Sequence, residues 1–327
     1  MFRVLITGGC GYLGSAVAAA LVDIPGTEIV VVDRLLYGIV PEVMRAPNIQ
    51  LLVGDIRDAE LMRSAVKGVD AVIHLAAIVG EPACLVAPEY AESTNLSGTE
   101  IVLSLARENG VGVFVFASSC SIYGTHDGSE TSRLPPYTLH KLLAEQKVLE
   151  QHGRMRPVVA RLATLCGPSE RPRFDLVLNR FVADALQGQV LRVHGSGENS
   201  RPLLHVRDAA AQICRLLAPG RAAAPVLNIG RSGQVLTIHE LADLVCALIP
   251  ETKWTYESIE GGDERSYTPA FEQCERNVPA RAEWGLESAV HEQAGAIRAG
   301  LDPGDLAYNN AIGFRHYLES EEILPSS

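Results

Sequence analysis

The sequence lacks the features that place a chain in a membrane or in an oxidising compartment. Its seven cysteines, an odd number, are scattered and never spaced as CxxC, so neither a zinc site nor a disulfide framework is expected. No apolar run reaches the roughly eighteen residues needed to cross a bilayer. Met1 leads directly into the strand-like FRVLIT, with no basic leader and no cleavage site. We therefore expect a cytoplasmic protein with no bound metal and no membrane partner.

An excess of positive charge is also missing. The 28 Lys and Arg against 39 Asp and Glu give a net charge of −11 and a pI near 5.3. Such a balance argues against nucleic acid or an anionic membrane as the main partner. The chain has 327 residues, 47% of them hydrophobic and 20% charged, which is typical of a globular protein with a sizeable core.

The N-terminal segment has the pattern of a strand, a glycine-rich turn and a helix. Residues 3–7 (RVLIT) are apolar, three glycines follow with the spacing GxxGxxG, and an Ala/Val/Leu-rich helix is expected at 15–22. Such glycines permit a tight turn, close approach of the backbone to a pyrophosphate, and close helix–strand packing. The alternative is an ordinary glycine-rich turn without a ligand. The residues expected at the cofactor are Gly8, Gly11, Tyr12, Leu13 and Gly14.

The next two strands point to the same cofactor. Residues 28–32 end in Asp33, about twenty residues after the glycines, where a carboxylate can bind the ribose hydroxyls and repel a 2′-phosphate. NAD is therefore favoured as the cofactor, while the neighbouring Arg34 leaves NADP as an alternative. Residues 49–53 lead to Asp55, which is placed to reach the adenine amino group, and to Ile56.

Apolar strands alternate with helices along much of the chain, which predicts an α/β fold with a doubly wound parallel sheet of the Rossmann type. Strands are expected at 3–7, 28–32, 49–53, 70–74, 111–117, 157–162 and 226–229, and helices at 89–109, 137–151 and 206–217. Ligands bind beyond the carboxyl ends of such strands. The residues at those ends are Gly8, Asp33, Asp55, Ala76, Ser119 and Thr164. Beside Ala76, the small or apolar Leu75 and Ala77 let a cofactor lie close.

We divide the chain into two parts on this basis. Residues 1–166 form the predicted NAD-binding domain, with a return segment at about 204–230. Residues 167–203 and 231–327 form a smaller, mixed α/β lobe for the substrate. Its helices are expected at 174–188, 237–249 and 286–299, the last of these being the final helix, followed by a frayed tail at 319–327.

The candidate reactive groups are Tyr137 and Lys141, which lie four residues apart and so share one face of a helix. A phenol with a pKa of about 10 is a poor base at neutral pH. A nearby ammonium favours the phenolate, and a serine of the Ser118–Ser119 pair can hydrogen-bond the same substrate oxygen. This trio suits proton transfer to and from an alcohol that is oxidised to a ketone. YxxxK alone also occurs on solvated helix faces.

The segments TGGCGYLGS, GDIRD, HLAA, SSCSIYG, YxxxK and RPLLHVRD together resemble the extended short-chain dehydrogenase/reductase superfamily. More narrowly, they are similar to its nucleotide-sugar epimerase/dehydratase branch. The similarity runs in order from residue 3 to about residue 300. It implies an NAD-dependent enzyme that acts on a nucleotide-diphosphate sugar. It also implies a homodimer formed by the helices that hold Asn95 and Tyr137.

The resemblance also implies individual roles. Tyr137 would be the acid/base, Lys141 its electrostatic partner and a ligand of the nicotinamide ribose, and Ser119 rather than Ser118 the partner of the sugar oxygen. Asn95 would support the cofactor site. The residues implied to contact the substrate are Ser119, Ser121, Thr164, Asn179, Arg201 and Arg265. The two arginines would grip the diphosphate, or are ordinary surface residues, and Ser121 can instead be a polar strand end that faces the cofactor.

Departures from the sequence motifs of this branch indicate which of its reactions the chain is less suited to catalyse. Dehydratases of this branch carry an Asp-Glu pair directly after the catalytic hydroxyl residue, where this chain has Cys120 and Ser121. Thr164 stands where many epimerases have Asn. Glu81, expected at the mouth of the pocket, either touches a substrate hydroxyl or is solvated.

These observations favour an NAD-dependent nucleotide-sugar epimerase, acting at C4 through a transient 4-keto sugar. One alternative is an NAD(P)H-dependent 4-ketoreductase that uses the same trio. Another, of a different class, is an inert NAD-binding sensor or scaffold. The sequence leaves the nucleotide, the sugar, the pathway and the epimerised carbon open.

Overall fold

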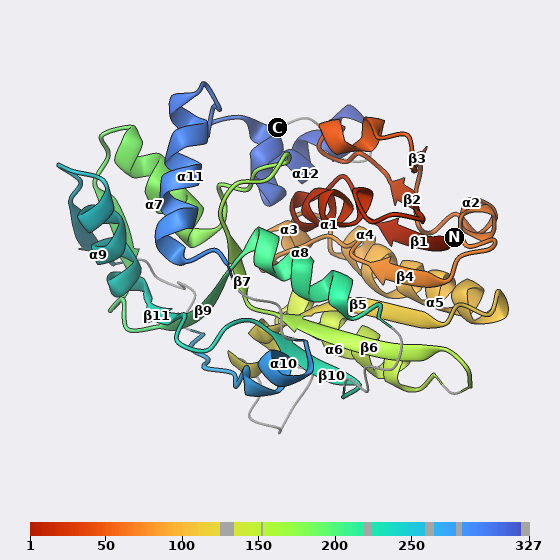
Figure 1. Ribbon diagram of the computed structural model, residues 1–327. Coiled ribbons are helices and arrows are strands. Elements are labelled where there is room, and N and C mark those ends of the chain that lie inside the picture. The colour runs from red at the N-terminus through yellow and green to blue at the C-terminus, as the bar shows by residue number, and fades with distance from the viewer. Residues whose placement is uncertain (125–133, 152, 219–223, 259–264, 279–282, 322–327) are drawn as a thin grey trace.

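The computed structural model describes residues 1–124, 134–151, 153–218, 224–258, 265–278 and 283–321. Figure 1 shows a parallel sheet with its helices on the right and a smaller group of elements on the left, around α7 (Val177–Leu186), α9 (Ile238–Leu248) and α11 (Leu286–Arg298). Within the described ranges, no helix is long and apolar enough to cross a bilayer.

The central sheet has seven strands in the order β10-β6-β5-β4-β1-β2-β3, and every neighbouring pair is parallel. The strands are β1 (Phe2–Thr7), β2 (Thr27–Asp33), β3 (Ile49–Val53), β4 (Ala71–His74), β5 (Val113–Ser119), β6 (Arg156–Leu162) and β10 (Val226–Ile229). The strand order reverses between β1 and β4, and a crevice for a ligand forms at such a reversal. The predicted doubly wound sheet is confirmed.

Each strand places its side chains alternately in two apolar layers. Val4 and Ile6 of β1 pack in the layer beneath α1 (Tyr12–Val22), α8 (Val206–Arg215) and α10 (Glu272–Asn277). Leu5 packs on the opposite face, beneath α2 (Ala59–Ala65), α5 (Thr99–Glu108) and α6 (Pro136–Leu149). Because both faces are covered, the strands are apolar throughout, as the sequence shows.

The helix expected at 89–109 consists of three joined segments. These are α4 (Pro88–Glu92), a π-helical stretch at Ser93–Gly98, and α5. π-helical turns are rare and often occur at functional sites. This one carries Thr94 and Asn95, and Thr94 lines the pocket described below.

In the described part of the smaller lobe, the strands form two short sheets. One has the order β11-β9-β7, formed by Val235–Thr237, Ser200–His205 and Thr164–Cys166, with one antiparallel and one parallel pair. The other pairs β12 (Trp254–Glu257) with β8 (Leu191–His194). An apolar core joins these strands to α7, α9 and α11. The predicted smaller mixed lobe is therefore present, whereas the exact division of the chain into domains stays a prediction.

The helix at 286–299 is not the final one. A 3-10 turn at Leu306–Tyr308 leads to α12 (Asn310–Ser320), which crosses back and packs against α3 (Glu81–Val86). Phe314 and Leu318 of α12 are completely buried. Helix α12 is seen at the top centre of Figure 1, between the lobe and the parallel sheet. Of the frayed tail predicted at 319–327, residues 319 and 320 instead belong to α12, and residues 322–327 lie outside the described residues.

Candidate functional site

The glycine loop between β1 and α1 depends on the absence of side chains at two positions. Gly8 has φ +73°, and a Cβ there would lie 2.7 Å from the backbone nitrogen of Ala76 at the end of β4. A Cβ on Gly14 would overlap the carbonyl oxygen of Gly8, so only glycine lets α1 start so close to the strand. The loop therefore brings the ends of β1 and β4 together at the crevice.

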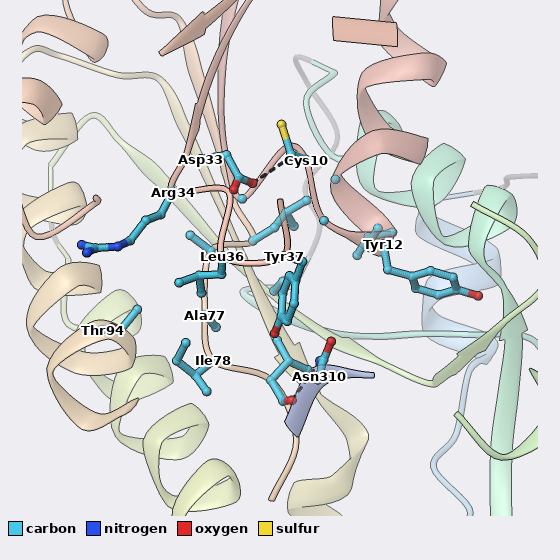
Figure 2. A pocket seen from close by; sticks show the side chains of 18 of the residues that line it. Cys10, Tyr12, Asp33, Arg34, Leu36, Tyr37, Ala77, Ile78, Thr94 and Asn310 are labelled. Atoms are coloured by element: carbon cyan, nitrogen blue, oxygen red, sulfur yellow. Dashed lines mark hydrogen bonds between the residues drawn. The ribbon is translucent and has the colours of Figure 1, made fainter. Parts of the chain in front are cut away.

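A pocket extends from this loop to Tyr137 and Lys141 on α6. Thirteen of the residues predicted to bind the cofactor line it: Gly8, Gly11, Tyr12, Leu13, Gly14, Asp33, Asp55, Ile56, Leu75, Ala76, Ala77, Tyr137 and Lys141. Figure 2 shows part of this wall, with Asp33 and Cys10 on one side and Tyr37 with Asn310 on another.

Asp33 holds two loops in place around the pocket. Its carboxylate accepts hydrogen bonds from the backbone nitrogens of Cys10 (2.9 Å) and Leu35 (2.8 Å). Burial raises the pKa of this carboxyl. A carboxylate still has further acceptor positions, so a ribose contact remains compatible with these bonds.

Asp55 is held by two arginines. Arg57 donates from Nε (3.0 Å) and Nη2 (2.7 Å), and Arg34 donates from Nη1. Burial opposes ionisation, but the hydrogen bonds from Arg57 and Arg34 keep the pKa of Asp55 below its usual value. Arg34 also donates from Nε to the hydroxyl of Tyr317 on α12, at 2.6 Å. Arg34, the residue that had left NADP as an alternative, is therefore already engaged through its Nε and Nη1.

Two hydroxyl groups near the adenosine end support the fit of a dinucleotide. Thr94 and Tyr90 both line the pocket. Their hydroxyl groups are buried and have no hydrogen-bond partner among the described residues. Buried hydroxyls normally find a partner. Together with the open glycine cradle, they fit a polar ligand that completes their bonding.

Asn95 does not line the pocket itself, and its contacts agree with the supporting role expected of it. Its Oδ1 accepts a hydrogen bond from the nitrogen of Ile78 (2.8 Å), and its Nδ2 donates to the oxygen of the same residue (3.0 Å). Asn95 is therefore a clamp on the loop after β4. The residue of this π-helical turn that lines the pocket is Thr94, which was not among the residues predicted at the site.

Tyr137 and Lys141 lie together as predicted, but burial dominates their ionisation. Lys141 Nζ donates to the carbonyl oxygen of Ala117 (2.7 Å) and lies 5.8 Å from the centroid of the Tyr137 ring. Burial lowers the pKa of Lys141 to about 8 and raises the pKa of Tyr137. The largest influence that lowers the pKa of Tyr137 is the charge of Arg173, which lines the same pocket. No local pattern in the sequence points to Arg173, because it comes from the distant loop after β7.

The two serines at the end of β5 have different environments. Ser118 is buried and donates to Glu145, whose carboxylate also pairs with Arg161 at 2.6 Å. Ser119 is less buried, and its Oγ accepts from the nitrogen of Ser121 at 3.1 Å. A hydroxyl that accepts one bond can still donate its proton. Ser118 lines the pocket, whereas Ser119 is not among its lining residues, so the choice of Ser119 as the substrate partner stays a prediction.

Glu81 caps the helix that carries Tyr137. Its Oε2 accepts from the backbone nitrogen of Tyr137 (2.8 Å), and its Oε1 accepts from the nitrogen (3.1 Å) and the hydroxyl (2.7 Å) of Thr138. Helix α6 begins after Pro135, which offers no side-chain cap, so Glu81 satisfies its first free N–H groups from another element. Glu81 is therefore a structural cap, neither simply solvated nor free for a substrate hydroxyl.

Arg201 and Arg265 come together near this cap. Arg201 donates to the carbonyl oxygen of Arg265, and its guanidinium lies 5.3 Å from the centroid of the Tyr267 ring. Arg265 pairs with Glu81 at 3.5 Å, and Tyr267 is hydrogen-bonded to Thr164. The predicted substrate residues Thr164, Arg201 and Arg265 thus form one cluster, to which the structure adds Tyr267.

Asn179, by contrast, is a buried structural residue. Its Oδ1 accepts from the nitrogen of Gly167 (2.9 Å), and its Nδ2 donates to the carbonyl oxygen of Arg173 (2.9 Å) and to the hydroxyl of Tyr12 (3.3 Å). These bonds fix the loop that carries Arg173. A direct contact between Asn179 and the nucleotide does not fit this placement, because its amide is already occupied.

The doubly wound sheet, the glycine cradle at its switch point, and a Tyr-Lys pair beside a strand-end serine are features of an NAD-dependent short-chain dehydrogenase/reductase. Comparison with known families agrees: residues 4–230 match the model of the NAD dependent epimerase/dehydratase family. The chain belongs to this family, and NAD is its cofactor.

Individual relatives differ in their reactions. The chain is 29% identical to a dTDP-glucose 4,6-dehydratase of an Actinoplanes species, over 91% of this chain and 98% of the relative. It is 30% identical to the low-salt glycan biosynthesis protein Agl12 of Haloferax volcanii, over 88% and 96%. Among solved structures, it is similar to MoeE5 in complex with UDP-glucuronic acid and NAD, with 26% identity, a TM-score of 0.79, and coverage of 91% and 100%. It is also similar to UDP-glucose 4-epimerase of Thermotoga maritima with UDP-glucose, with 25% identity, a TM-score of 0.79, and coverage of 92% and 100%.

The buried amine of Lys141 predicts a pH-dependent stability. Below about pH 8 the folded and unfolded states both hold the proton, and the cost of burying the ammonium is fully present. Between about pH 8 and the usual value of 10.5, the unfolded state binds a proton that the folded state does not. The free energy of unfolding of the wild type should therefore rise relative to Lys141→Met, by at most about 1.4 kcal/mol per pH unit.

Urea unfolding of both proteins across this pH range measures the difference, with Lys147→Met, an exposed lysine of the same helix, as the control for loss of a charge. If the difference in the free energy of unfolding between the wild type and Lys141→Met falls or stays constant as the pH rises, the lowered pKa of Lys141 is contradicted.

The cap made by Glu81 predicts a second effect. Glu81→Ala leaves the first N–H groups of α6 without their acceptor, so we expect a loss of about 1–2 kcal/mol in stability together with a lower kcat. Glu81→Gln keeps one oxygen acceptor and should recover part of both. Denaturant unfolding and steady-state kinetics measure the two quantities. Equal stability and kcat in Glu81→Ala and the wild type would show that the cap is dispensable.

Proposed function

We propose that the protein is a nucleotide-sugar 4-epimerase that works with retained NAD. The observation that carries the proposal is the pair Cys120–Ser121, which follows Ser119 where a dehydratase of this branch would have two carboxyls. Oxidation and reduction of a carbinol need one proton-transfer group, whereas elimination of water also needs an acid and a base at the neighbouring carbons. Ser119, Tyr137 and Lys141 meet the first requirement, a group that transfers the proton of the carbinol.

The environments of Cys120 and Ser121 support this proposal. Cys120 is completely buried in the core, its thiol contacts the carbonyl oxygen of Arg161 (3.3 Å), and burial raises its pKa. Because this thiol is fully buried and bonded to a main-chain carbonyl oxygen, it is not accessible to a substrate. Ser121 is buried, and its hydroxyl has no partner within the described part of the chain, which fits a contact with a substrate oxygen better than acid/base work.

Within the described ranges, two carboxylates around Tyr137 and Arg173 have other partners. Glu81 is occupied by the start of α6 and by Arg265. Asp175, in the neighbouring loop, is held by two hydrogen bonds from Arg173, at 3.0 and 2.6 Å. Both carboxylates are therefore engaged by other groups of the chain.

The proposed mechanism uses the chain's residues as follows. Tyr137 accepts the proton of the C4 hydroxyl and returns it at the end, while Ser119 donates a hydrogen bond to the same oxygen. NAD, when bound, supplies a group that takes the C4 hydride and gives it back. Arg201 and Arg265 hold the diphosphate while the sugar turns, so that the opposite face of the 4-keto group is presented. Binding energy from the remote nucleotide thus positions the reacting ring.

A 4-ketoreductase that exchanges NADPH is the main alternative. The geometry favours it less, because Asp33 lines the pocket where it would repel a 2′-phosphate, and Arg34 already donates from Nε and Nη1 to Tyr317 and Asp55. An inert NAD-binding sensor would not need the Ser119, Tyr137 and Lys141 set.

We also propose a homodimer through α5 and α6. Part of the apolar surface of these helices is unavailable to a partner, because Val102, Leu105 and Val148 are buried within the chain's own core. Ile101, Leu142 and Leu143 remain partly exposed on these helices.

The proposed acid/base role of Tyr137 is tested by Tyr137→Phe, which removes one hydroxyl and keeps the ring. We expect kcat to fall by about 10²–10⁴-fold, the usual contribution of a proton-transfer group, while bound NAD is retained. Turnover of a panel of nucleotide sugars, followed by NMR, and the nucleotide content of the purified protein measure the two effects. Near-normal turnover in this variant would exclude the mechanism.

A further inference from the structure

We propose that the C-terminal segment 306–320 is a clasp that closes one wall of the cofactor pocket and makes entry and release of NAD slow. This segment lies beyond residue 230, where the match to the family model ends. Its helix α12 nevertheless packs on the half of the molecule that carries the cofactor site, against α3. Asn310, its first residue, lines the pocket and lies beside Tyr37 in Figure 2.

The first lock joins the clasp to the loop after β7. Arg171, which is almost completely buried, donates from Nη1 to Oδ1 of Asn310 (2.7 Å), and from Nε and Nη2 to the carbonyl oxygen of Ala307 (3.1 and 2.8 Å). Nδ2 of Asn310 donates to the carbonyl oxygen of Val79, in the loop after β4. The Arg171 guanidinium also lies 3.6 Å from the centroid of the Tyr37 ring. Three loops that border the pocket are therefore tied to the start of α12.

The second lock joins the clasp to the adenosine end. Arg34 follows Asp33 directly, and its Nε donates to the hydroxyl of Tyr317 at 2.6 Å while its Nη1 holds Asp55. The guanidinium lies 5.5 Å from the centroid of the Tyr317 ring. Arg34, which lines the pocket, is thus hydrogen-bonded both to Asp55, a predicted adenosine ligand, and to Tyr317 of the clasp.

An apolar plug fills the space between the two locks. Phe314 and Leu318 are completely buried among Ile78, Ala83 and Cys84, and the Phe314 ring packs 5.4 Å from that of Tyr90. Ile78 is the residue clamped by Asn95, and Tyr90 lines the pocket. Displacing α12 would expose this cluster and break both locks together, so opening of this wall is slow.

The clasp has a consequence for catalysis that holds for any sugar the enzyme accepts. An enzyme that oxidises and then re-reduces the same molecule needs its cofactor to stay bound between the two steps. A pocket wall that seldom opens retains the cofactor between the two steps. It does so without taking part in the chemistry.

The test measures cofactor exchange directly, independently of turnover. The full-length protein is loaded with NADH, release is followed by the loss of NADH fluorescence during a chase with excess NAD, and entry is followed by stopped flow. The variants are Asn310→Ala, which breaks the first lock, and Tyr317→Phe, which removes only the acceptor of Arg34. His316→Ala, an exposed residue of the same helix, is the matched control.

We expect at least one lock variant to accelerate both entry and release about tenfold, since both movements pass the same wall, while His316→Ala behaves as the wild type. Rates within twofold of the control in both lock variants would overturn the proposal. Faster release with unchanged entry would also overturn it, because that result indicates a lost direct contact with the cofactor. Because Tyr317→Phe keeps the aromatic ring, it remains informative if Asn310→Ala folds poorly.

Discussion

The in-register parallel pairing of β2, β1, β4 and β5 is the constraint on which the rest of the site depends. Thr7 pairs with Val32 and His74, and His74 pairs with Phe116, so these strands end at one edge of the sheet. That edge brings the glycine loop, Asp33, the loop after β4 and the serines of β5 to one crevice. Because both faces of the sheet are buried, a shift in register would move apolar side chains out of their layers, which makes the arrangement strongly specified.

A second level of organisation holds the loops at this edge, and it depends on polar side chains that do not themselves face the substrate. Asn95 clamps Ile78, Asn179 fixes Gly167, and Glu81 caps the helix of Tyr137. Each satisfies backbone groups that would otherwise be buried without partners, and each such loss is costly. Residues that resemble catalytic or binding groups in the sequence thus have structural roles that position the reactive groups.

The sequence predicted the sheet, the glycine loop and the Tyr137–Lys141 pair because these are local patterns: apolar runs, glycine spacing, and residues four apart on a helix. It did not predict the cap by Glu81 or the influence of Arg173 on Tyr137, because both join segments far apart in the chain. Helix α12 is a different case. Its apolar residues Ala311, Phe314 and Leu318 have helical spacing, and Asn309 caps it through Ile312 N at 3.1 Å, so a local signal was present. Its contacts with Arg34 and Arg171 are not predicted by any local pattern, because these residues are far from α12 in the chain.

The central claim is that one hydride leaves C4 of a nucleotide sugar and returns to the same carbon. The most direct measurement is NMR of products formed from UDP- and dTDP-sugars that carry deuterium at C4. The account predicts that the product is the C4 epimer and that its deuterium is still at C4, without added NAD. Deuterium at C6 of a 4-keto-6-deoxy product would show a dehydratase, and deuterium transferred to free nicotinamide cofactor would show a dehydrogenase or reductase; either result would contradict the account.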